Sequence, residues 1–264
     1  MPRPRVWPVF VAYVMAIATI VLASLTALAA LRAANPDVAD LELLSGVTAL
    51  IAGALASSTA LILTVALMHQ PFDAVALRLV PGRERGIDLA AAVLGMLALG
   101  QVLDSLAMLA GLGGTGSMPM IRRALTGVQG AELFAAILVL WLMAGAAEEL
   151  FFRGYMQTRL RAAWPPAAAV TVTSVAFGLL HMEWVHASMA FVLGLYLGML
   201  TERTGSALPA IVCHVVNNSL FTVLTALTDT VESRRVNVML LATSAAIFLM
   251  CVDLLRHRLS RASA

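Results

Sequence analysis

Three charged residues stand together in an otherwise apolar stretch, residues 148–153, which read Glu-Glu-Leu-Phe-Phe-Arg. In an α-helix Glu149 and Arg153 are one turn apart with the acid on the N-terminal side, the favoured order for an ion pair. Glu148 points about 100° away around the helix. We therefore expect Glu149 to neutralise Arg153 and Glu148 to keep a carboxylate that can exchange a proton. A simple Arg–Glu clamp between helices is the alternative interpretation.

Two further apolar stretches carry a histidine one helical turn from a second informative residue. Phe177 precedes His181 by four residues, so the phenyl ring can pack beside the imidazole and fix its rotamer. His214 precedes Asn218 by the same spacing. Either pair alone is compatible with hydrogen bonding between core helices, and His186 is interpreted as an ordinary histidine of that kind.

The three clusters together contain the groups that hydrolysis inside a membrane requires. A charged side chain in mid-bilayer costs at least about 2.5–3.5 kcal/mol, so such residues indicate function. A carboxylate, two imidazoles and a carboxamide can activate water and stabilise an oxyanion. Water inside a membrane requires a cavity within a helical bundle. The candidate catalytic residues are Glu148, His181, His214 and Asn218, with Glu149, Arg153 and Phe177 in support.

A zinc site and a cysteine nucleophile are the alternative chemistries. Two histidines and a carboxylate commonly bind catalytic zinc, but the helical His-Glu-x-x-His pattern is absent and Arg153 is an unfavourable neighbour for a cation. We therefore expect no cofactor, with zinc as the minority alternative. Cys213 adjoins His214 but points about 100° away on a helix, so an ordinary buried cysteine is expected.

The composition indicates the elements that must position these residues. Of 264 residues, 61% are hydrophobic and 12% charged, against roughly 45–50% and 25% in soluble domains. This excludes a soluble enzyme, a disordered protein and a nucleic-acid binder, and it makes the lipid bilayer a partner. We predict an all-α, polytopic membrane helical bundle. Residues 1–264 form one integral membrane domain, with the catalytic helices within 131–227.

About eight transmembrane helices are expected, because each needs about 20 mostly apolar residues. The first is too long for an ordinary signal peptide and is predicted to be retained. Residues 111–130 are interpreted as a re-entrant or interfacial stretch. The predicted spans are Trp7–Leu31, Leu43–Met68, Leu89–Leu112, Leu133–Phe152, Ala167–Met182, Trp184–Leu200, Ala207–Leu227 and Val236–Leu255.

The orientation follows from the basic residues, all 17 of which are arginines. Positively charged loops stay in the cytoplasm. An N-terminus on the inside gives 11 arginines inside and 5 outside, apart from Arg153 within a helix. Both termini are therefore predicted to be cytoplasmic, in the inner membrane of a bacterium. The three clusters are expected to meet below the cytoplasmic surface, so substrate should arrive along the bilayer or from a cytoplasmic mouth.

The motifs Glu148-Glu149-x-x-x-Arg153, Phe177-x-x-x-His181 and His214-x-x-x-Asn218 together resemble the signature of a known family. It is the CPBP family of CAAX prenyl proteases and bacteriocin-processing proteins, also called Rce1-like or Abi. The lead-in at residues 203–206, Arg-Thr-Gly-Ser, is similar as well. The resemblance covers residues 148–218 and implies an intramembrane glutamic endopeptidase that requires no metal.

The same resemblance implies residue roles. Glu148, aided by His181, would activate water, while His214 and Asn218 would stabilise the tetrahedral oxyanion. The expected substrate is a peptide, propeptide or C-terminal sorting tail with a membrane-proximal cleavage site. A non-enzymatic membrane protein, either a peptide-binding immunity protein or a proton-coupled carrier, is the alternative function.

Overall fold

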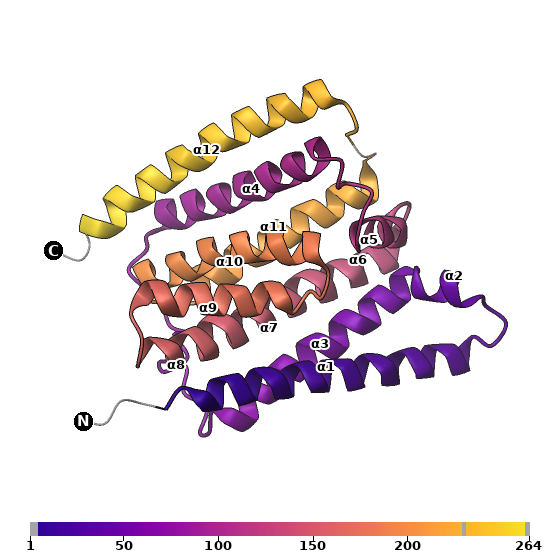
Figure 1. The fold of residues 1–264 in the computed structure, drawn as a ribbon, viewed down its shortest axis with the longest axis horizontal. Helices are drawn as coiled ribbons and strands as arrows, with labels where there is room; N and C mark the ends of the chain where they lie inside the picture. Colours follow the sequence, from indigo (N-terminus) through magenta and orange to yellow (C-terminus); the bar gives the residue numbers. More distant parts are fainter. Residues whose placement is uncertain (1–4, 229–230, 262–264) are drawn as a thin grey trace.

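The structure is a computed structural model and describes residues 5–228 and 231–261. Every regular element in these ranges is helical (Figure 1). Two π-helical stretches, η1 and η2, connect α6, α7 and α8 into one continuous helix. The elements are α1 (Trp7–Ala34), α2 (Asp40–Leu44), α3 (Val47–Met68), α4 (Gly86–Leu109), α5 (Met118–Leu125), α6 (Gly130–Ile137), η1 (Leu138–Met143), α7 (Ala144–Glu149), η2 (Leu150–Gln157), α8 (Thr158–Arg161), α9 (Pro166–Leu179), α10 (Trp184–Thr204), α11 (Leu208–Leu227) and α12 (Arg234–Arg261).

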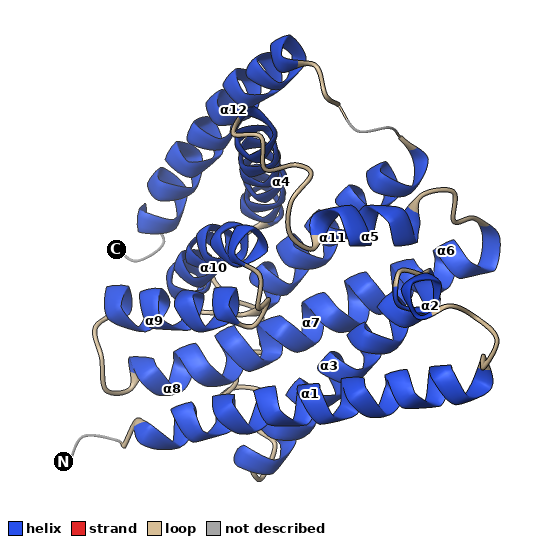
Figure 2. Cartoon of the chain, turned by 45° about the vertical axis from the view of Figure 1, so that its right-hand side comes forward, coloured by secondary structure: helices blue, strands red, loops and turns tan. Residues whose placement is uncertain are grey.

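The long helices pack in pairs around two central helices. α1 packs on α3, α4 on α12 and α9 on α10. The continuous helix that contains α7 lies between the α1–α3 pair and α11, as Figures 1 and 2 show. The start of α1 and the end of α12 lie at the same end of the bundle (Figure 1). The helix that carries the acidic pair is therefore central.

Seven helices in the described residues are long and apolar enough to cross a membrane. Their outer faces expose large apolar side chains, including Leu22 (67% exposed), Leu67 (69%) and Met250 (71%). Apolar surface of this extent requires lipid as its solvent. The chain is a polytopic helical membrane bundle, which confirms the predicted fold class. The seven are Trp7–Ala34, Val47–Met68, Gly86–Leu109, Gly130–Arg161, Trp184–Thr204, Leu208–Leu227 and Arg234–Ser260.

The predicted span Ala167–Met182 was too long. Its helix, α9, is Pro166–Leu179, with 14 residues, or about 21 Å at 1.5 Å per residue, short of the 30 Å hydrocarbon layer. Proline is favoured in the first turn of a helix, because its missing N–H has no partner there, and Pro166 occupies that place. His181 consequently lies in the turn after α9 and not inside a helix.

Glu183 fixes the far side of that turn. Its carboxylate accepts hydrogen bonds from the backbone N–H groups of Val185 (2.8 Å) and His186 (3.0 Å). These bonds satisfy free donors at the start of α10, as a capping residue does. The chain therefore reverses direction between α9 and α10 at the level of the predicted site.

The acidic pair lies between two π-helical stretches of one continuous helix, Gly130–Arg161. Glu148 and Glu149 end α7, with η1 before it and η2 after it. A π-helical turn contains more residues than an α-helical turn, and such turns occur often at functional sites. The sequence predicts a regular α-helix here, and the two π-helical stretches differ from that expectation.

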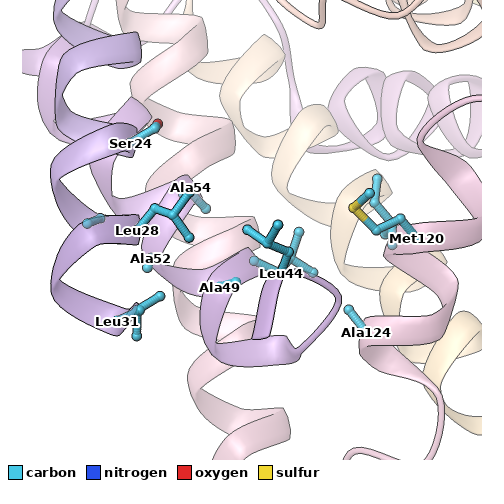
Figure 3. A pocket seen from close by; sticks show the side chains of 13 residues that line it. Ser24, Leu28, Leu31, Leu44, Ala49, Ala52, Ala54, Met120 and Ala124 are labelled. Carbon is cyan, nitrogen blue, oxygen red and sulfur yellow. The ribbon is translucent and has the colours of Figure 1, made fainter. Parts of the chain in front are cut away.

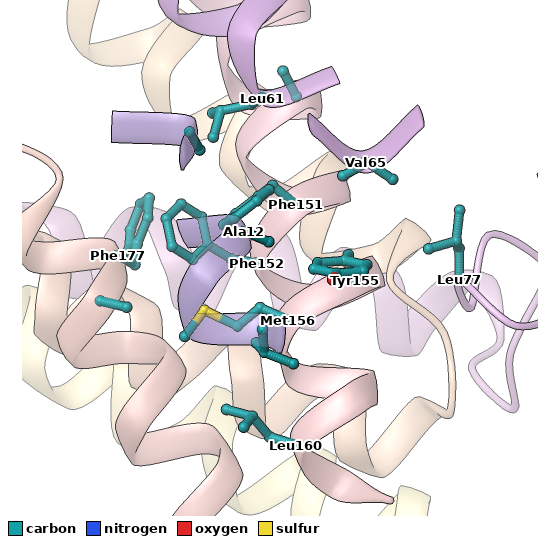
Figure 4. Packing of buried hydrophobic residues seen from close by; sticks show 14 of the residues in the cluster. Ala12, Leu61, Val65, Leu77, Phe151, Phe152, Tyr155, Met156, Leu160 and Phe177 are labelled. Atoms are coloured by element: carbon teal, nitrogen blue, oxygen red, sulfur yellow. The ribbon is translucent and has the colours of Figure 1, made fainter. Parts of the chain in front are cut away.

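A dense apolar core follows the acidic pair along this helix. Phe151, Phe152, Met156 and Leu160 have no exposed surface, and Tyr155 is 3% exposed. Figure 4 shows these side chains packed with residues of α1, α3 and α9. The Phe151 and Phe152 rings meet edge to face at 5.1 Å. Well-packed side chains of this kind leave few voids larger than water.

The end of the bundle beyond this core is rich in arginine and is called the arginine-rich end. It comprises residues 69–85, 159–165, 203–207 and 256–261 together with Arg5. Glu202 joins three segments there, since it accepts hydrogen bonds from Arg78 (2.8 Å), Arg161 (2.6 Å) and Gln157 (3.0 Å). The predicted cytoplasmic Arg3 lies outside the described residues.

The opposite end, called the α5 end, comprises residues 35–46, 110–130, 182–184, 228 and 231–233. The segment predicted to be re-entrant or interfacial contains the short helix α5, which packs against α11 and α3. The hydroxyl oxygen of Ser117, directly before α5, lies 3.5 Å from Nδ1 of His186. The α5 segment thus covers the bundle on the side opposite the arginine-rich end.

Candidate active site

The predicted ion pair is present and is joined by a third residue. Arg153 donates to Oε1 of Glu149 at 2.8 Å, with both side chains fully buried. Nδ1 of His214 lies 2.8 Å from the same oxygen. A second guanidinium nitrogen of Arg153 donates to the carbonyl oxygen of Gly194 at 3.0 Å. Glu149 therefore links α11 to the central helix, and Arg153 links the central helix to α10.

Phe177 is the aromatic centre of this cluster. The guanidinium carbon of Arg153 lies 4.7 Å from the centre of the Phe177 ring, within the range of a cation–π contact. The His181 and His214 rings meet Phe177 edge to face at centroid distances of 5.2 and 5.7 Å. The predicted contact between Phe177 and His181 is present, and the same ring also positions His214.

Glu148 points away from the ion pair into a cavity of about 330 Å³. Its carboxylate is 3.6 Å from Nε2 of His214, just beyond direct hydrogen-bonding distance. Its side chain is 15% exposed, whereas that of Glu149 is fully buried. The two neighbouring acids thus have different surroundings, as their angular separation on the helix predicts.

The cavity brings together all four predicted catalytic residues. Its walls include Glu148, His181, His214 and Asn218, with Phe177 beside them. They come from the central helix, the turn after α9, and α11. Glu149 and Arg153 lie behind the cavity wall. Glu148, His181 and His214, each more than thirty residues from the next in the sequence, therefore converge on one cavity.

His186 also lines the cavity. Its ring lies 4.2 Å from that of His181, edge to face. From the sequence alone, His186 is expected to be an ordinary histidine. The turn that reverses the chain at Leu180–Glu183 is what brings the two rings together.

Asn217 is a polar cavity residue that the spacing argument did not select. It is 6% exposed and lines the cavity. Its Nδ2 donates a hydrogen bond of 3.4 Å to Oδ1 of Asn218. A Cβ atom on Gly100 of α4 would come within 2.8 Å of Oδ1 of Asn217. Because Gly100 has no side chain, α4 can approach α11 closely there and still leave room for Asn217.

Asp104 and Arg122 line the cavity nearer the α5 end. Both also line a smaller adjoining cavity of about 120 Å³, which reaches Thr228 and Asn237. Their positions on α4 and α5 depend on tertiary packing, so no local pattern in the sequence selects them. They extend the polar lining beyond the four predicted residues.

An apolar groove of about 440 Å³ lies beside the α5 end, between α1, α3 and α5 (Figure 3). Its walls include Leu28, Leu44 and Met120, which Figure 3 labels. Leu50 and Ile121 line both this groove and the active-site cavity. The groove and the cavity are therefore neighbours that share a wall.

The two alternative chemistries, a cysteine nucleophile and a zinc site, can be compared with the structure. Cys213 is a free cysteine with no exposed surface, as expected for an ordinary buried cysteine. Among residues 5–228 and 231–261, no three His, Cys, Asp or Glu side chains form a group suited to a metal ion. The expectation about zinc remains a prediction.

Fold and site define a multi-pass helical membrane protein with a polar cavity in its centre. Residues 130–220 match the family model described as type II CAAX prenyl endopeptidase Rce1-like. This match confirms the resemblance drawn from the motifs, because it contains all three of them. Comparison with curated proteins gave no match, and neither did comparison with solved structures.

Proposed function

We propose that the protein is an intramembrane glutamic endopeptidase of a bacterial inner membrane. The observation that carries the proposal is the convergence of Glu148, His181, His214 and Asn218 on one cavity beside a buried ion pair. The matched family model, which describes endopeptidases, supports the same reaction class. The substrate is a peptide, propeptide or sorting tail that is cleaved close to the membrane.

Charge balance favours a doubly protonated His214. The buried cluster contains two carboxylates and one guanidinium, so a second positive charge makes it neutral. Its Nδ1–H is directed at Glu149 and its Nε2 faces Glu148. In that form Nε2–H can donate to an oxyanion that develops in the cavity.

The reaction starts when Glu148, with His181, holds a water molecule and accepts one of its protons. The resulting hydroxide attacks the carbonyl carbon of the peptide bond. The negative charge on the tetrahedral oxygen is stabilised by His214 Nε2–H and the Asn218 amide. Glu148 then returns the proton to the amine nitrogen, the C–N bond breaks, and a carboxylic acid and an amine leave. General acid–base catalysis of this kind contributes about 10²–10⁴-fold.

Glu148→Gln tests the mechanism in protein reconstituted into liposomes with a quenched fluorogenic peptide library. We expect turnover to fall by about 10²–10⁴-fold, because the amide cannot accept the proton. Glu132→Gln is the matched control, since Glu132 lies on the same continuous helix but is exposed. Equal turnover by wild type and Glu148→Gln would contradict the mechanism.

The same variant separates an enzyme from a binding protein. A peptide-binding immunity protein or a carrier should tolerate a change that keeps the size and polarity of the side chain. Peptide binding that is retained by Glu148→Gln, with no cleavage by wild type, would therefore favour the non-enzymatic function.

A further inference from the structure

We propose that the active-site cavity opens on the extracytoplasmic side, so that the substrates are polypeptide segments exposed at the outer face of the membrane. The statement that polypeptide segments are the substrates rests on the proposed peptidase function. The direction of the cavity and the orientation of the bundle do not depend on that function. The inference replaces the cytoplasmic mouth expected from the sequence.

The cavity extends from the buried ion pair toward the α5 end. On α11 its lining begins at His214 and continues through Asn218 and Phe221 to Thr225. The 11 steps from His214 to Thr225 rise about 16.5 Å. They lead away from Ser206, whose hydroxyl donates to the carbonyl oxygen of Val80 in the arginine-rich end. On α4 the lining likewise moves from Met96 to Asp104, away from Gly86.

The opposite direction is closed by side chains. Between Glu149 and the arginine-rich end, the side chains of Phe151, Phe152 and Met156 on the central helix are completely buried. Gln157, one step further, is also fully buried and donates to the carbonyl oxygen of Gly198 at 3.0 Å. A water molecule or a peptide moving from the arginine-rich end would have to displace this packed layer.

Polar groups mark a route from the cavity to the α5 end. Asp104 and Arg122 belong both to the active-site cavity and to the smaller cavity next to it. That smaller cavity reaches Thr228 at the end of α11 and Asn237 near the start of α12. These residues therefore place polar side chains between the α5 end and the cavity that contains Glu148.

The apolar groove of Figure 3 is at the same end. On α1 it is lined by residues from Ser24 to Leu31, in the last third of the helix, and on α3 by residues from Ala49 to Ala54, near the first turns. A segment that approached the cavity from lipid through this groove would also come from the leaflet at the α5 end.

The arginines assign the two ends to the two sides of the membrane. Eleven of the 17 arginines lie in the segments of the arginine-rich end or in the residues before α1. Five belong to the opposite side: Arg122 and Arg123 in the α5 end, and Arg32, Arg234 and Arg235 in the adjoining turns of α1 and α12. Because arginine-rich loops remain in the cytoplasm, the arginine-rich end is cytoplasmic and the α5 end faces outward. The cavity faces outward with it.

Site-specific thiol labelling tests the orientation and the opening together. In a background with Cys213→Ala and Cys251→Ala, which removes both native thiols, we would introduce Thr225→Cys in the cavity. Glu132→Cys reports the α5 end, which it adjoins, and Ser260→Cys the arginine-rich end, since both positions are exposed. A membrane-impermeant maleimide is then applied to spheroplasts and to inverted membrane vesicles.

We expect Thr225→Cys and Glu132→Cys to be labelled in spheroplasts and not in inverted vesicles, and Ser260→Cys to show the reverse. Labelling of Thr225→Cys only from inverted vesicles, or from neither side, would overturn the proposal. Labelling requires no turnover, so the result is independent of whether Glu148→Gln abolishes cleavage. As a second readout, a peptide added to intact spheroplasts should be cleaved by wild type and not by Glu148→Gln.

Discussion

His214 and Arg153 bond to the same oxygen atom, Oε1 of Glu149, each at 2.8 Å. A carboxylate that receives Nδ1–H fixes the orientation of an imidazole and leaves its Nε2 facing the reaction centre, as in other catalytic sites. The geometry of His214 therefore depends on Glu149, and the position of Glu149 depends on Arg153.

Glu149→Gln is expected to lower kcat strongly while KM changes little. The amide is a weaker acceptor and can present its NH₂ group to Nδ1, which disturbs the orientation of His214. Losses from such changes are about 10²–10⁴-fold. Steady-state kinetics in proteoliposomes measure this. A large increase in KM with unchanged kcat would instead assign Glu149 to substrate binding.

Arg153→Met is expected to destabilise the protein by about 3–5 kcal/mol, because it removes the guanidinium from the buried charge of Glu149. Thermal unfolding in detergent micelles measures the loss. The double variant Glu149→Gln/Arg153→Met removes both charges and should recover much of the stability. If the double variant is no more stable than Arg153→Met, the ion pair does not account for the effect.

Asn217→Ala is expected to reduce kcat by about 10-fold. The loss of one hydrogen bond contributes about 1.4 kcal/mol, which corresponds to a factor of ten in rate. Asn217 donates to Oδ1 of Asn218, and we expect this contact to hold the orientation of the Asn218 amide. Gly100→Ala should act similarly, because its methyl group would displace Asn217. Gly86→Ala on the same helix has open space around it and serves as the control. Wild-type kcat in Asn217→Ala would exclude this positioning role.

Glu202→Gln should lower thermal stability and leave kcat nearly unchanged at low temperature. The variant weakens the contacts to Arg78 and Arg161, and hydrogen bonds to charged groups contribute about 1.5–3 kcal/mol each. Arg203→Gln, the adjacent position on α10, is the comparison. A selective fall in kcat for Glu202→Gln would connect the arginine-rich end to catalysis, contrary to our expectation.

Turnover is expected to persist in the presence of a strong chelator, because the proposed mechanism uses protein groups alone. The measurement compares untreated protein, chelated protein, and chelated protein with zinc added back. Loss of turnover on chelation and its recovery with zinc would support the zinc-dependent alternative.

The ion pair and the separation of the two acids were predictable because they depend on positions within one helix. The spacing of Glu149 and Arg153 decides their contact, and a change of one residue turns Glu148 toward a different surface. The apolar length of each segment likewise predicted seven of the spans. Local geometry was sufficient for these features.

The remaining features depend on contacts between distant segments. His186 joins the cavity because the turn after α9 reverses the chain, and Asn217 does so because α4 approaches closely at Gly100. The length of α9 was overestimated because the apolar residues continue past the helix into the turn. Hydropathy describes the solvent of a segment, whereas these outcomes depend on where its helix ends.

The short helix α9 also has a consequence for the surrounding lipid. Val175, Leu179 and Trp184 are 43%, 61% and 63% exposed, so lipid chains contact α9 and its turn. A helix of about 21 Å beside a hydrocarbon layer of about 30 Å produces a hydrophobic mismatch, which a bilayer accommodates by thinning. We therefore expect a local depression of the membrane next to His181 and faster turnover in bilayers of short-chain lipids than in thick ones.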